Sequence, residues 1–213
     1  MLHTLSRIDV GRIVAVSLFT LMLFVTGGHL ATEDFSEPLT PLVSVLTIAF
    51  YLLLVAAYLR RSPSSRTDRR WGSWLVAFLG TGAPFAIPLV SDGPRTGLLA
   101  SAAAVVLAVG LAAMLWALGA LGTNISVVPQ AREVVTHGPY ARVRHPLYAA
   151  ELLNVVGLCL AATGPWPWVV LVALVTFQVA RARREEALLA TELPGYAAYR
   201  DRTPMLVPAL GRS

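Results

Sequence analysis

The sequence predicts an all-α fold, a polytopic membrane bundle of about five or six membrane helices followed by a cytosolic helical segment at the C-terminal end. Of the 213 residues, 56% are hydrophobic and 14% are charged, with a mean hydropathy of +0.65, whereas a soluble domain averages roughly 25% charged residues. Apolar runs of membrane length follow one another along the chain. The net charge is +5, and the arginines cluster at the ends of these runs, which indicates membrane topology and anionic lipid contact rather than nucleic-acid binding.

The first three apolar runs cover residues 10–30, 39–59 and 71–90. A spanning helix needs about 20 apolar residues, and each run has that length. The first run resembles a signal peptide, but His29 stands where cleavage before Ala31 would need a small residue, so we expect a retained helix. Gly80, Gly82, Pro84 and Pro88 interrupt the third run, which predicts a kinked or broken helix.

A fourth run covers residues 96–121 and carries Ala104, Ala108 and Ala112 along one stripe. Small residues four positions apart allow membrane helices to approach closely. This stripe therefore predicts a tight helix contact.

The last two apolar runs, 147–162 and 166–180, are shorter. The turn Thr163-Gly164-Pro165 separates them, which predicts a helical hairpin. Cys159 lies inside the first of these runs and is expected to be a small packing residue.

Charge in the connections predicts the orientation. Residues 60–70 contain five arginines and one aspartate, whereas residues 31–38 contain three acidic residues and no basic one. The positive-inside rule places 60–70 in the cytoplasm. Counting along the helices then places the N-terminus, residues 123–145 and the chain from residue 181 on the same cytoplasmic side.

The first polar cluster is the segment HGPYARVRHPLYAAE, residues 137–151. Its two prolines fix the backbone, and Pro146 suits the first turn of a helix that begins near Leu147. Arg144 and His145 then lie at a helix N-terminus, where free N–H groups favour an anionic ligand. An interfacial anchor, in which arginine and tyrosine are common, is the alternative for this segment alone.

The second polar cluster is RARREEALLATELPGYAAYRDRTPMLVP, residues 181–208. Glu185 and Glu186 leave the last apolar run side by side, and Tyr196 and Tyr199 follow a Pro-Gly helix stop. An amphipathic surface helix would explain the leucines and arginines, but it explains the carboxylate pair less well. Because the predicted hairpin returns the chain to the same face, we expect the two clusters to meet.

The two clusters together resemble the integral-membrane methyltransferases of the isoprenylcysteine carboxyl methyltransferase and phospholipid methyltransferase group. The resemblance extends from Gly138 to Pro208, and the earlier helices match only as generic membrane helices. The residues that match the family pattern are Gly138, Pro139, Tyr140, Arg144, His145, Pro146, Tyr148, Glu185, Glu186, Tyr196, Tyr199, Arg202 and Pro208. The chain departs from the pattern at Ala149-Ala150-Glu151 and at Leu193-Pro194-Gly195, which puts the acceptor rather than the cofactor in question.

The resemblance implies that S-adenosyl-L-methionine binds where the clusters meet and that a lipophilic acceptor enters from the bilayer. It implies one membrane domain, 1–213, in which residues 1–122 supply the N-terminal helices and 123–213 the catalytic part. The cofactor-binding residues it implies are His137, Gly138, Tyr140, Arg144, His145, Pro146, Tyr148, Glu185, Glu186, Tyr196 and Tyr199. The catalytic residues it implies are His145, Arg202 and Glu186, and no metal is expected. Besides the acceptor, membrane lipids are the expected partners, and nucleic acid is not.

The chemistry of the acceptor stays open at this point. A carboxylate is already a nucleophile and needs only a positioning cation, for which Arg202 is the candidate. An amine or hydroxyl needs a general base, for which His145, His137 or a glutamate is the candidate.

Two other functions are consistent with the sequence. One is a sterol-reductase-like membrane enzyme that uses a nicotinamide cofactor. The other is a non-enzymatic membrane protein such as a transporter, which should place ionisable groups near the middle of the bilayer. Glu151 is the nearest case of such a group.

Overall fold

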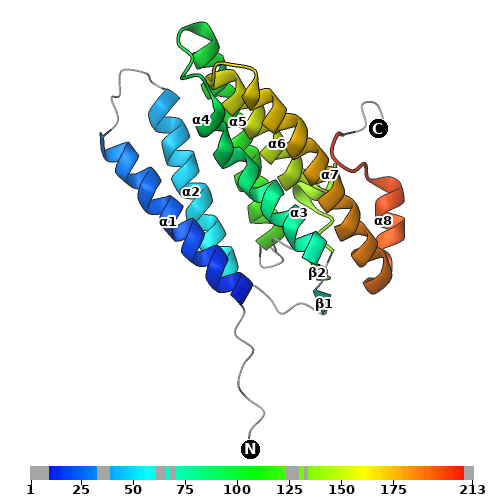
Figure 1. The fold of residues 1–213 in the computed structure, drawn as a ribbon. Helices are drawn as coiled ribbons and strands as arrows, with labels where there is room; N and C mark the ends of the chain where they lie inside the picture. Colours follow the sequence, from blue (N-terminus) through cyan, green and yellow to red (C-terminus); the bar gives the residue numbers. More distant parts are fainter. Residues whose placement is uncertain are drawn as a thin grey trace, which may run out of the picture.

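The computed structural model describes residues 10–32, 39–60, 66–67, 71–122, 130–131 and 134–208. The helices are α1 (Val10–Thr32), α2 (Leu39–Leu59), α3 (Trp71–Gly82), the 3-10 helix η1 (Ala83–Ala86), α4 (Ile87–Val90), α5 (Leu98–Leu121), the 3-10 helix η3 (Gly138–Ala141), α6 (Pro146–Ala161), α7 (Trp166–Glu192) and α8 (Tyr196–Arg202). Two short antiparallel strands, β1 (Arg66–Thr67) and β2 (Gln130–Ala131), pair with Arg66 opposite Ala131. The all-helical prediction is confirmed apart from this pair (Figure 1).

The third apolar run is broken, as its prolines predict. Helix α3 ends at Gly82, and Pro84 and Pro88 start the 3-10 segment η1 and the short helix α4. Proline has no N–H and its ring clashes with the preceding turn, so an unbroken α-helix cannot pass through both positions.

Helix α7 is longer than the sequence pattern predicts. The apolar run 166–180 and the polar segment after it form one continuous helix of 27 residues. The change from apolar to charged residues at Arg181 does not end the helix, because alanine, arginine, glutamate and leucine all favour helical backbone. The helix ends before Pro194 and Gly195, where Gly195 takes a φ of +87° and lets the chain turn into α8.

Two glycines bring α5 and α6 together. A Cβ on Gly110 would lie 2.7 Å from the side-chain amide of Asn154, and one on Gly157 would lie 2.8 Å from the side chain of Leu107. Glycine permits this close approach of the two helices. In the predicted alanine stripe, Ala104 and Ala108 are half-buried and Ala112 is exposed, so its role in a tight helix contact stays a prediction.

Large apolar side chains cover much of the outside of the bundle, among them Phe24, Val109 and Val172, which are 74%, 55% and 68% exposed. Such a surface is expected where lipid rather than water surrounds the helices. Within the part of the chain that the structure describes, two stretches are long and apolar enough to cross a membrane, Pro41–Leu59 and Leu98–Leu121, and Arg12–Gly28 and Pro146–Ala161 are apolar but shorter. The expected number of five or six spans stays a prediction.

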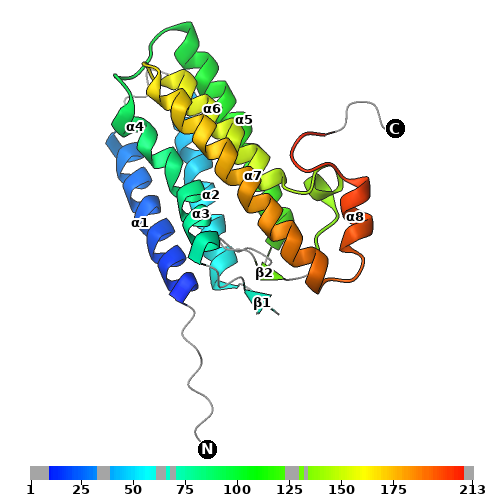
Figure 2. The ribbon, with the colours of Figure 1, turned by 45° about the vertical axis from the view of Figure 1, so that its right-hand side comes forward.

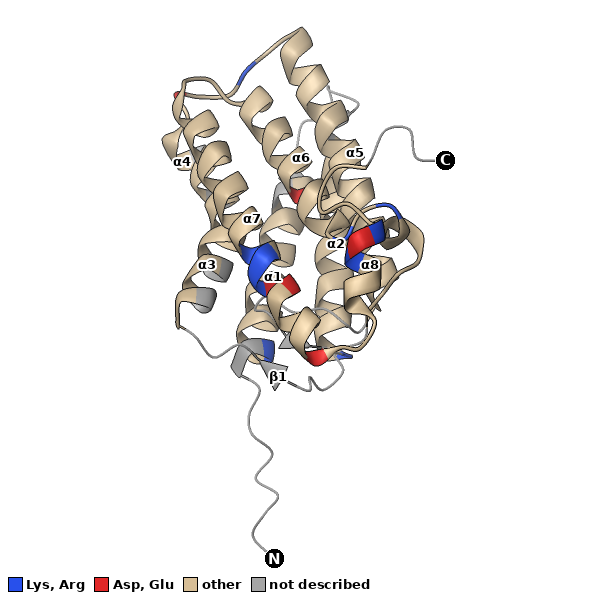
Figure 3. Cartoon of the chain, turned by 90° about the vertical axis from the view of Figure 1, so that its right-hand side faces the viewer, with Lys and Arg blue, Asp and Glu red and all other residues tan. Residues whose placement is uncertain are grey.

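The two ends of the bundle differ in character (Figures 1 and 3). At one end, the segment before α5 is fastened to the α6–α7 turn: the Arg95 guanidinium donates to the Ala162 carbonyl at 3.0 Å, and Thr163 N–H donates to the Gly93 carbonyl at 2.9 Å. The end of α7, α8 and the β1–β2 pair lie at the opposite end (Figure 2). Most of the charged residues in Figure 3 gather there. The hairpin of α6 and α7 therefore returns the chain to the end from which it started, as predicted.

Candidate functional site

Arg144 joins three segments at the polar end of the bundle. Its guanidinium donates to both carboxylate oxygens of Glu186 on α7, at 2.7 and 3.2 Å. Its remaining nitrogen, Nη1, donates to the carbonyls of Arg200 and Thr203 at the end of α8, both at 2.6 Å. A planar guanidinium suits this two-sided arrangement, because its donors point along fixed directions in one plane.

The chain after α8 lies across the start of α6. The backbone N–H of Arg144 donates to the Pro204 carbonyl at 2.9 Å, and that of His145 donates to the Met205 carbonyl at 3.0 Å. Helix α6 begins at Pro146 with His145 as its N-cap, as the sequence predicts. The two polar clusters therefore meet through main chain as well as side chains.

His145 is buried where the two polar clusters meet. Its Nε2 lies 3.0 Å from Glu186 Oε1, and its ring stacks on that of Tyr148 with the centroids 5.2 Å apart and the planes 5° apart. Burial raises the pKa of the Glu186 carboxyl, but hydrogen bonds and electrostatic interactions with His145 and Arg144 outweigh it, so that the pKa lies below its ordinary value. Glu186 is therefore held as a carboxylate.

Tyr148 connects this polar cluster to the interior of the bundle. Its hydroxyl donates to Glu185 Oε2 at 2.7 Å. His145 covers one side of the ring system, and the Arg181 guanidinium lies 4.7 Å from the ring centroid, a cation–π contact. Glu185 and Glu186 thus have different partners: a neutral phenol for the first, an arginine and a histidine for the second.

Three tyrosines complete the polar cluster, and all three are buried. The Tyr199 hydroxyl donates to the Tyr140 carbonyl at 2.6 Å, and the rings of Tyr196 and Tyr199 meet edge to face at 6.0 Å between centroids. Burial raises the pKa of Tyr199 to about 12, with smaller contributions from Arg144, which lowers it, and Glu186, which raises it. Burial also raises the pKa of Tyr196 and Tyr140, and nearby carboxylates add to the effect. All three phenols are therefore neutral donors at physiological pH.

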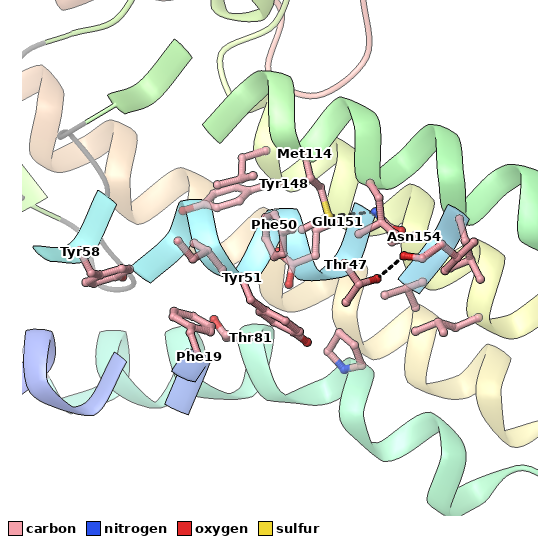
Figure 4. Close-up of a pocket in the computed structure, with 18 of the residues that line it drawn as sticks. Phe19, Thr47, Phe50, Tyr51, Tyr58, Thr81, Met114, Tyr148, Glu151 and Asn154 are labelled. Atoms are coloured by element: carbon pink, nitrogen blue, oxygen red, sulfur yellow. Dashed lines mark hydrogen bonds between the residues drawn. The ribbon is translucent and has the colours of Figure 1, made fainter. Parts of the chain in front are cut away.

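A cavity of about 420 Å³ lies on the other side of Tyr148 (Figure 4). Its walls come from α1, α2, α3, η1, α5, α6 and α7 and are mostly apolar, with Phe19, Phe50, Leu111 and Met114 among them. Its volume is in the range of ligand pockets, roughly 300–1,000 Å³. Tyr148, Glu151 and Arg181 form part of its lining, so the cavity directly adjoins the polar cluster.

The family model described as phospholipid methyltransferase matches residues 96–193, which include Arg144, His145, Tyr148, Glu185 and Glu186. The resemblance predicted from the two polar clusters is thereby confirmed for this methyltransferase family, whose matched segment runs from the start of α5 to the end of α7.

Two curated relatives share part of the sequence. The cobalt-zinc-cadmium resistance protein CzcN of Cupriavidus metallidurans is 34% identical over 46% of this chain and 50% of its own length. The nickel-cobalt-cadmium resistance protein NccN of Alcaligenes xylosoxydans xylosoxydans is 30% identical over 47% of this chain and 53% of its own length. The chain thus spans about half the length of the curated relatives it matches. Within the described residues, no group of three or more His, Cys, Asp and Glu side chains is placed to hold a metal ion.

The structure brings most, but not all, of the predicted site residues together. Pro146 lies buried at the start of α6. Arg202 is exposed and its Nε donates to the Ala198 carbonyl of its own helix at 2.9 Å. His137 and Gly138 are also exposed, at the start of η3. Helix α8 is short and presents Tyr196 and Tyr199, rather than Arg202, to the interior.

Three residues that line or support the cavity were absent from the predicted site: Glu151, Arg181 and Gln178. Gln178 is fully buried and donates through Nε2 to the Glu151 carboxylate, and Arg181 is 6% exposed. The signal that points to them is the presence of polar side chains within or beside apolar membrane runs, where they are costly unless they have a function.

Proposed function

We propose that this chain is an S-adenosylmethionine-dependent membrane methyltransferase whose lipophilic acceptor occupies the cavity between the helices. The observation that carries the proposal is the position of Tyr148, which belongs at once to the polar cluster and to the wall of the apolar cavity. A water-soluble methyl donor and an oil-soluble acceptor need such adjoining sites. The phospholipid methyltransferase match over 96–193 supports the same activity.

The residues of the polar cluster fit the donor chemically. S-adenosylmethionine supplies a methyl group on a positively charged sulfur when it is bound. The Glu185 carboxylate, whose hydrogen-bond donor is a neutral phenol, is suited to attract that sulfonium or the amino group. The rings of Tyr196, Tyr199 and Tyr140 are suited to the adenine. Arg144, His145 and Glu186 position this pocket through their hydrogen bonds to one another.

The proposal includes an orientation and a class of acceptor. The polar end faces the cytoplasm, because β1, which belongs to the arginine-rich stretch 60–70, lies at that end (Figure 2). The acceptor is a lipid or a lipid-modified molecule, like the prenylated acceptor of isoprenylcysteine carboxyl methyltransferases, and it enters from the bilayer. A dry, shaped cavity favours methyl transfer, which depends mainly on positioning and exclusion of water.

Calorimetry of the purified protein in lipid discs tests the function, with S-adenosylmethionine, S-adenosylhomocysteine and NADPH as separate ligands. We expect the first two to bind and NADPH not to bind. Labelled methyl groups from S-adenosylmethionine should also appear in extractable lipid after incubation with membranes. Binding of NADPH alone would replace this proposal by a reductase.

A further inference from the structure

A row of polar side chains descends between α6 and α7 from the polar cluster into the apolar part of the bundle. The row consists of Glu185, Tyr148, Arg181, Gln178 and Glu151. Tyr148 and Glu151 lie three residues apart on α6, and Gln178 and Arg181 lie three apart on α7, so each pair shares a helix face. Glu151 is thus about one helical turn deeper than Tyr148, and both line the cavity (Figure 4).

Gln178 holds the Glu151 carboxylate in the polar row. It is fully buried, it is not among the described residues that line the cavity, and its amide Nε2 donates to Glu151 Oε2. The amide must face Glu151 with its nitrogen, because an ionised carboxylate only accepts hydrogen bonds. Glu151 itself lines the cavity, so its carboxylate is held by Gln178 and can also meet a ligand there.

We propose that Glu151 accepts the proton of the methyl acceptor, whose head group is therefore a hydroxyl or an amine rather than a carboxylate. This inference rests on the proposed function and names the substrate class of the same site. The acceptor's oxygen or nitrogen forms a bond to the methyl carbon with its own lone pair. The carbon–sulfur bond breaks, its electron pair stays on sulfur as a neutral thioether, and the acceptor's proton passes to a Glu151 oxygen.

The charges of the polar row disfavour an acceptor that is already a carboxylate. One arginine, Arg181, stands against two glutamates, Glu151 and Glu185, so the row carries one net negative charge when all three are ionised. Arg181 is the one basic residue among the described residues that line the cavity. The sulfonium of bound S-adenosylmethionine would neutralise that charge, and a carboxylate head would then bring an uncompensated negative charge into an apolar environment, which is costly. An amine or hydroxyl brings none after it has lost its proton to Glu151 and gained the methyl group.

His145 is less suited to this proton transfer than Glu151. Its Nε2 faces Glu186 at 3.0 Å, and its ring lies against Tyr148 on the side of the polar cluster. It is not among the described residues that line the cavity, whereas Glu151 is. We therefore assign the proton acceptor to Glu151 and a positioning role to His145.

The test compares Glu151→Gln, Glu151→Asp and a matched control, Asp201→Asn, in full-length protein in lipid discs. Glu151→Gln keeps the shape of the side chain and its place beside Gln178 but cannot take a proton. Asp201 is exposed on α8, with 70% of its side chain accessible, so its replacement removes a carboxylate away from the cavity. The probes are farnesol, farnesylamine and N-acetyl-S-farnesylcysteine, which share one tail and differ in the head group. Binding of each labelled probe, binding of S-adenosylmethionine, melting temperature and methyl transfer are measured.

We expect wild type and Asp201→Asn to bind and methylate farnesol or farnesylamine in preference to N-acetyl-S-farnesylcysteine, and the two protic probes then show which head is used. Glu151→Gln should lower kcat on the preferred probe roughly a hundredfold, the usual range for a lost general base. In Glu151→Gln, the KM for the preferred probe and the affinity for S-adenosylmethionine should stay within about twofold of wild type, and the melting temperature within a few degrees. Glu151→Asp should recover part of kcat.

Two results would overturn the assignment. One is an unchanged kcat in Glu151→Gln while wild type binds S-adenosylmethionine, which leaves the proposed function standing. The other is tighter binding of N-acetyl-S-farnesylcysteine than of either protic probe by wild type, which counts against Glu151 even if no S-adenosylmethionine binds. Absence of S-adenosylmethionine binding and of methyl transfer in wild type rejects the proposed function and this inference with it.

Discussion

At the scale of single residues, the adjacent glutamates of α7 have separate tasks. Glu186 pairs with Arg144 and lies beside His145, and through Arg144 it is connected to the carbonyls at the end of α8. Glu185 accepts from the Tyr148 hydroxyl, and that ring also lines the cavity. The Glu186 carboxylate holds the polar cluster together, and the Glu185 carboxylate lies nearer to where donor and acceptor would meet.

Replacing each glutamate by glutamine should separate these tasks. Glu186→Gln breaks a charge-assisted pair in a partly buried position and should lower the free energy of unfolding by about 1.5–3 kcal/mol. Glu185→Gln should leave the melting temperature near that of wild type but weaken S-adenosylmethionine binding roughly tenfold to a hundredfold. Thermal melts and calorimetry of both variants provide the measurements. A lower melting temperature in Glu185→Gln, together with weaker S-adenosylmethionine binding in Glu186→Gln, would assign the two roles the other way round.

Acid should weaken the polar cluster through Glu186. Its pKa in the folded protein lies below the ordinary value near 4.5, so the carboxylate's contribution to stability is fully present above about pH 4.5 and is lost as the pH falls through the folded-state pKa. Melting temperatures of wild type should therefore fall more steeply below that pH than those of Glu186→Gln. Parallel curves for the two proteins would show that the ion pair contributes little.

The sequence predicted which residues belong to the polar cluster better than it predicted which of them contact one another. The motif halves from Gly138 to Tyr148 and from Glu185 to Tyr199 do meet, as expected from the hairpin that joins them. The exposed position of Arg202 could not be predicted, since it depends on which face the short helix α8 turns inward. Glu151 was visible in the sequence as an ionisable residue in an apolar run, but its pairing with Gln178 on another helix was not.

At the scale of helices, the α5–α6 contact depends on Gly157. A Cβ at this position would meet the Leu107 side chain at 2.8 Å and its backbone nitrogen at 3.2 Å, and backbone cannot move aside easily. Gly157→Ala should therefore force the helices apart and lower the free energy of unfolding by about 1–3 kcal/mol.

Gly119→Ala is the matched control for this prediction, because a Cβ there meets nothing within 4 Å. It should be neutral or stabilising by up to about 1 kcal/mol, since alanine favours the helix over glycine. The measurement is the melting temperature of Gly157→Ala and of Gly119→Ala in the same detergent. Equal effects of both substitutions would mean that the close approach at Gly157 is not tight.

Helix positions could be predicted closely because hydrophobic length and proline are local signals. The second run coincides with α2, and the break in the third falls at its prolines. The end of α7 was less predictable, because a polar sequence with good helix formers looks the same whether it continues a helix or begins another. The glycine contacts between α5 and α6 could not be predicted, since they depend on which residues of the neighbouring helix lie opposite Gly110 and Leu107.

At the scale of the whole molecule, the topology can be tested with single cysteines in a Cys159→Ala background. Thr96, at the end fastened by Arg95, and Ser36, which lies outside the described residues, should react with a membrane-impermeant thiol reagent from outside the cell. Ala197 on α8 is exposed and should react only after the membrane is opened, because the positive-inside rule predicts that the arginine-rich connections face the cytoplasm. Labelling of the cysteine at 36 from the cytoplasmic side alone would invert the topology.

The cavity's position among membrane helices also determines which concentration governs catalysis. Its walls are apolar residues of α1, α2, α5 and α6, so under the proposed function an acceptor partitions into the lipid before it is bound. The relevant quantity is then the mole fraction of acceptor in the bilayer and not its amount per volume of water. Dilution with inert lipid at a constant bulk concentration of acceptor should slow methyl transfer, as it does for enzymes that meet their substrates in two dimensions.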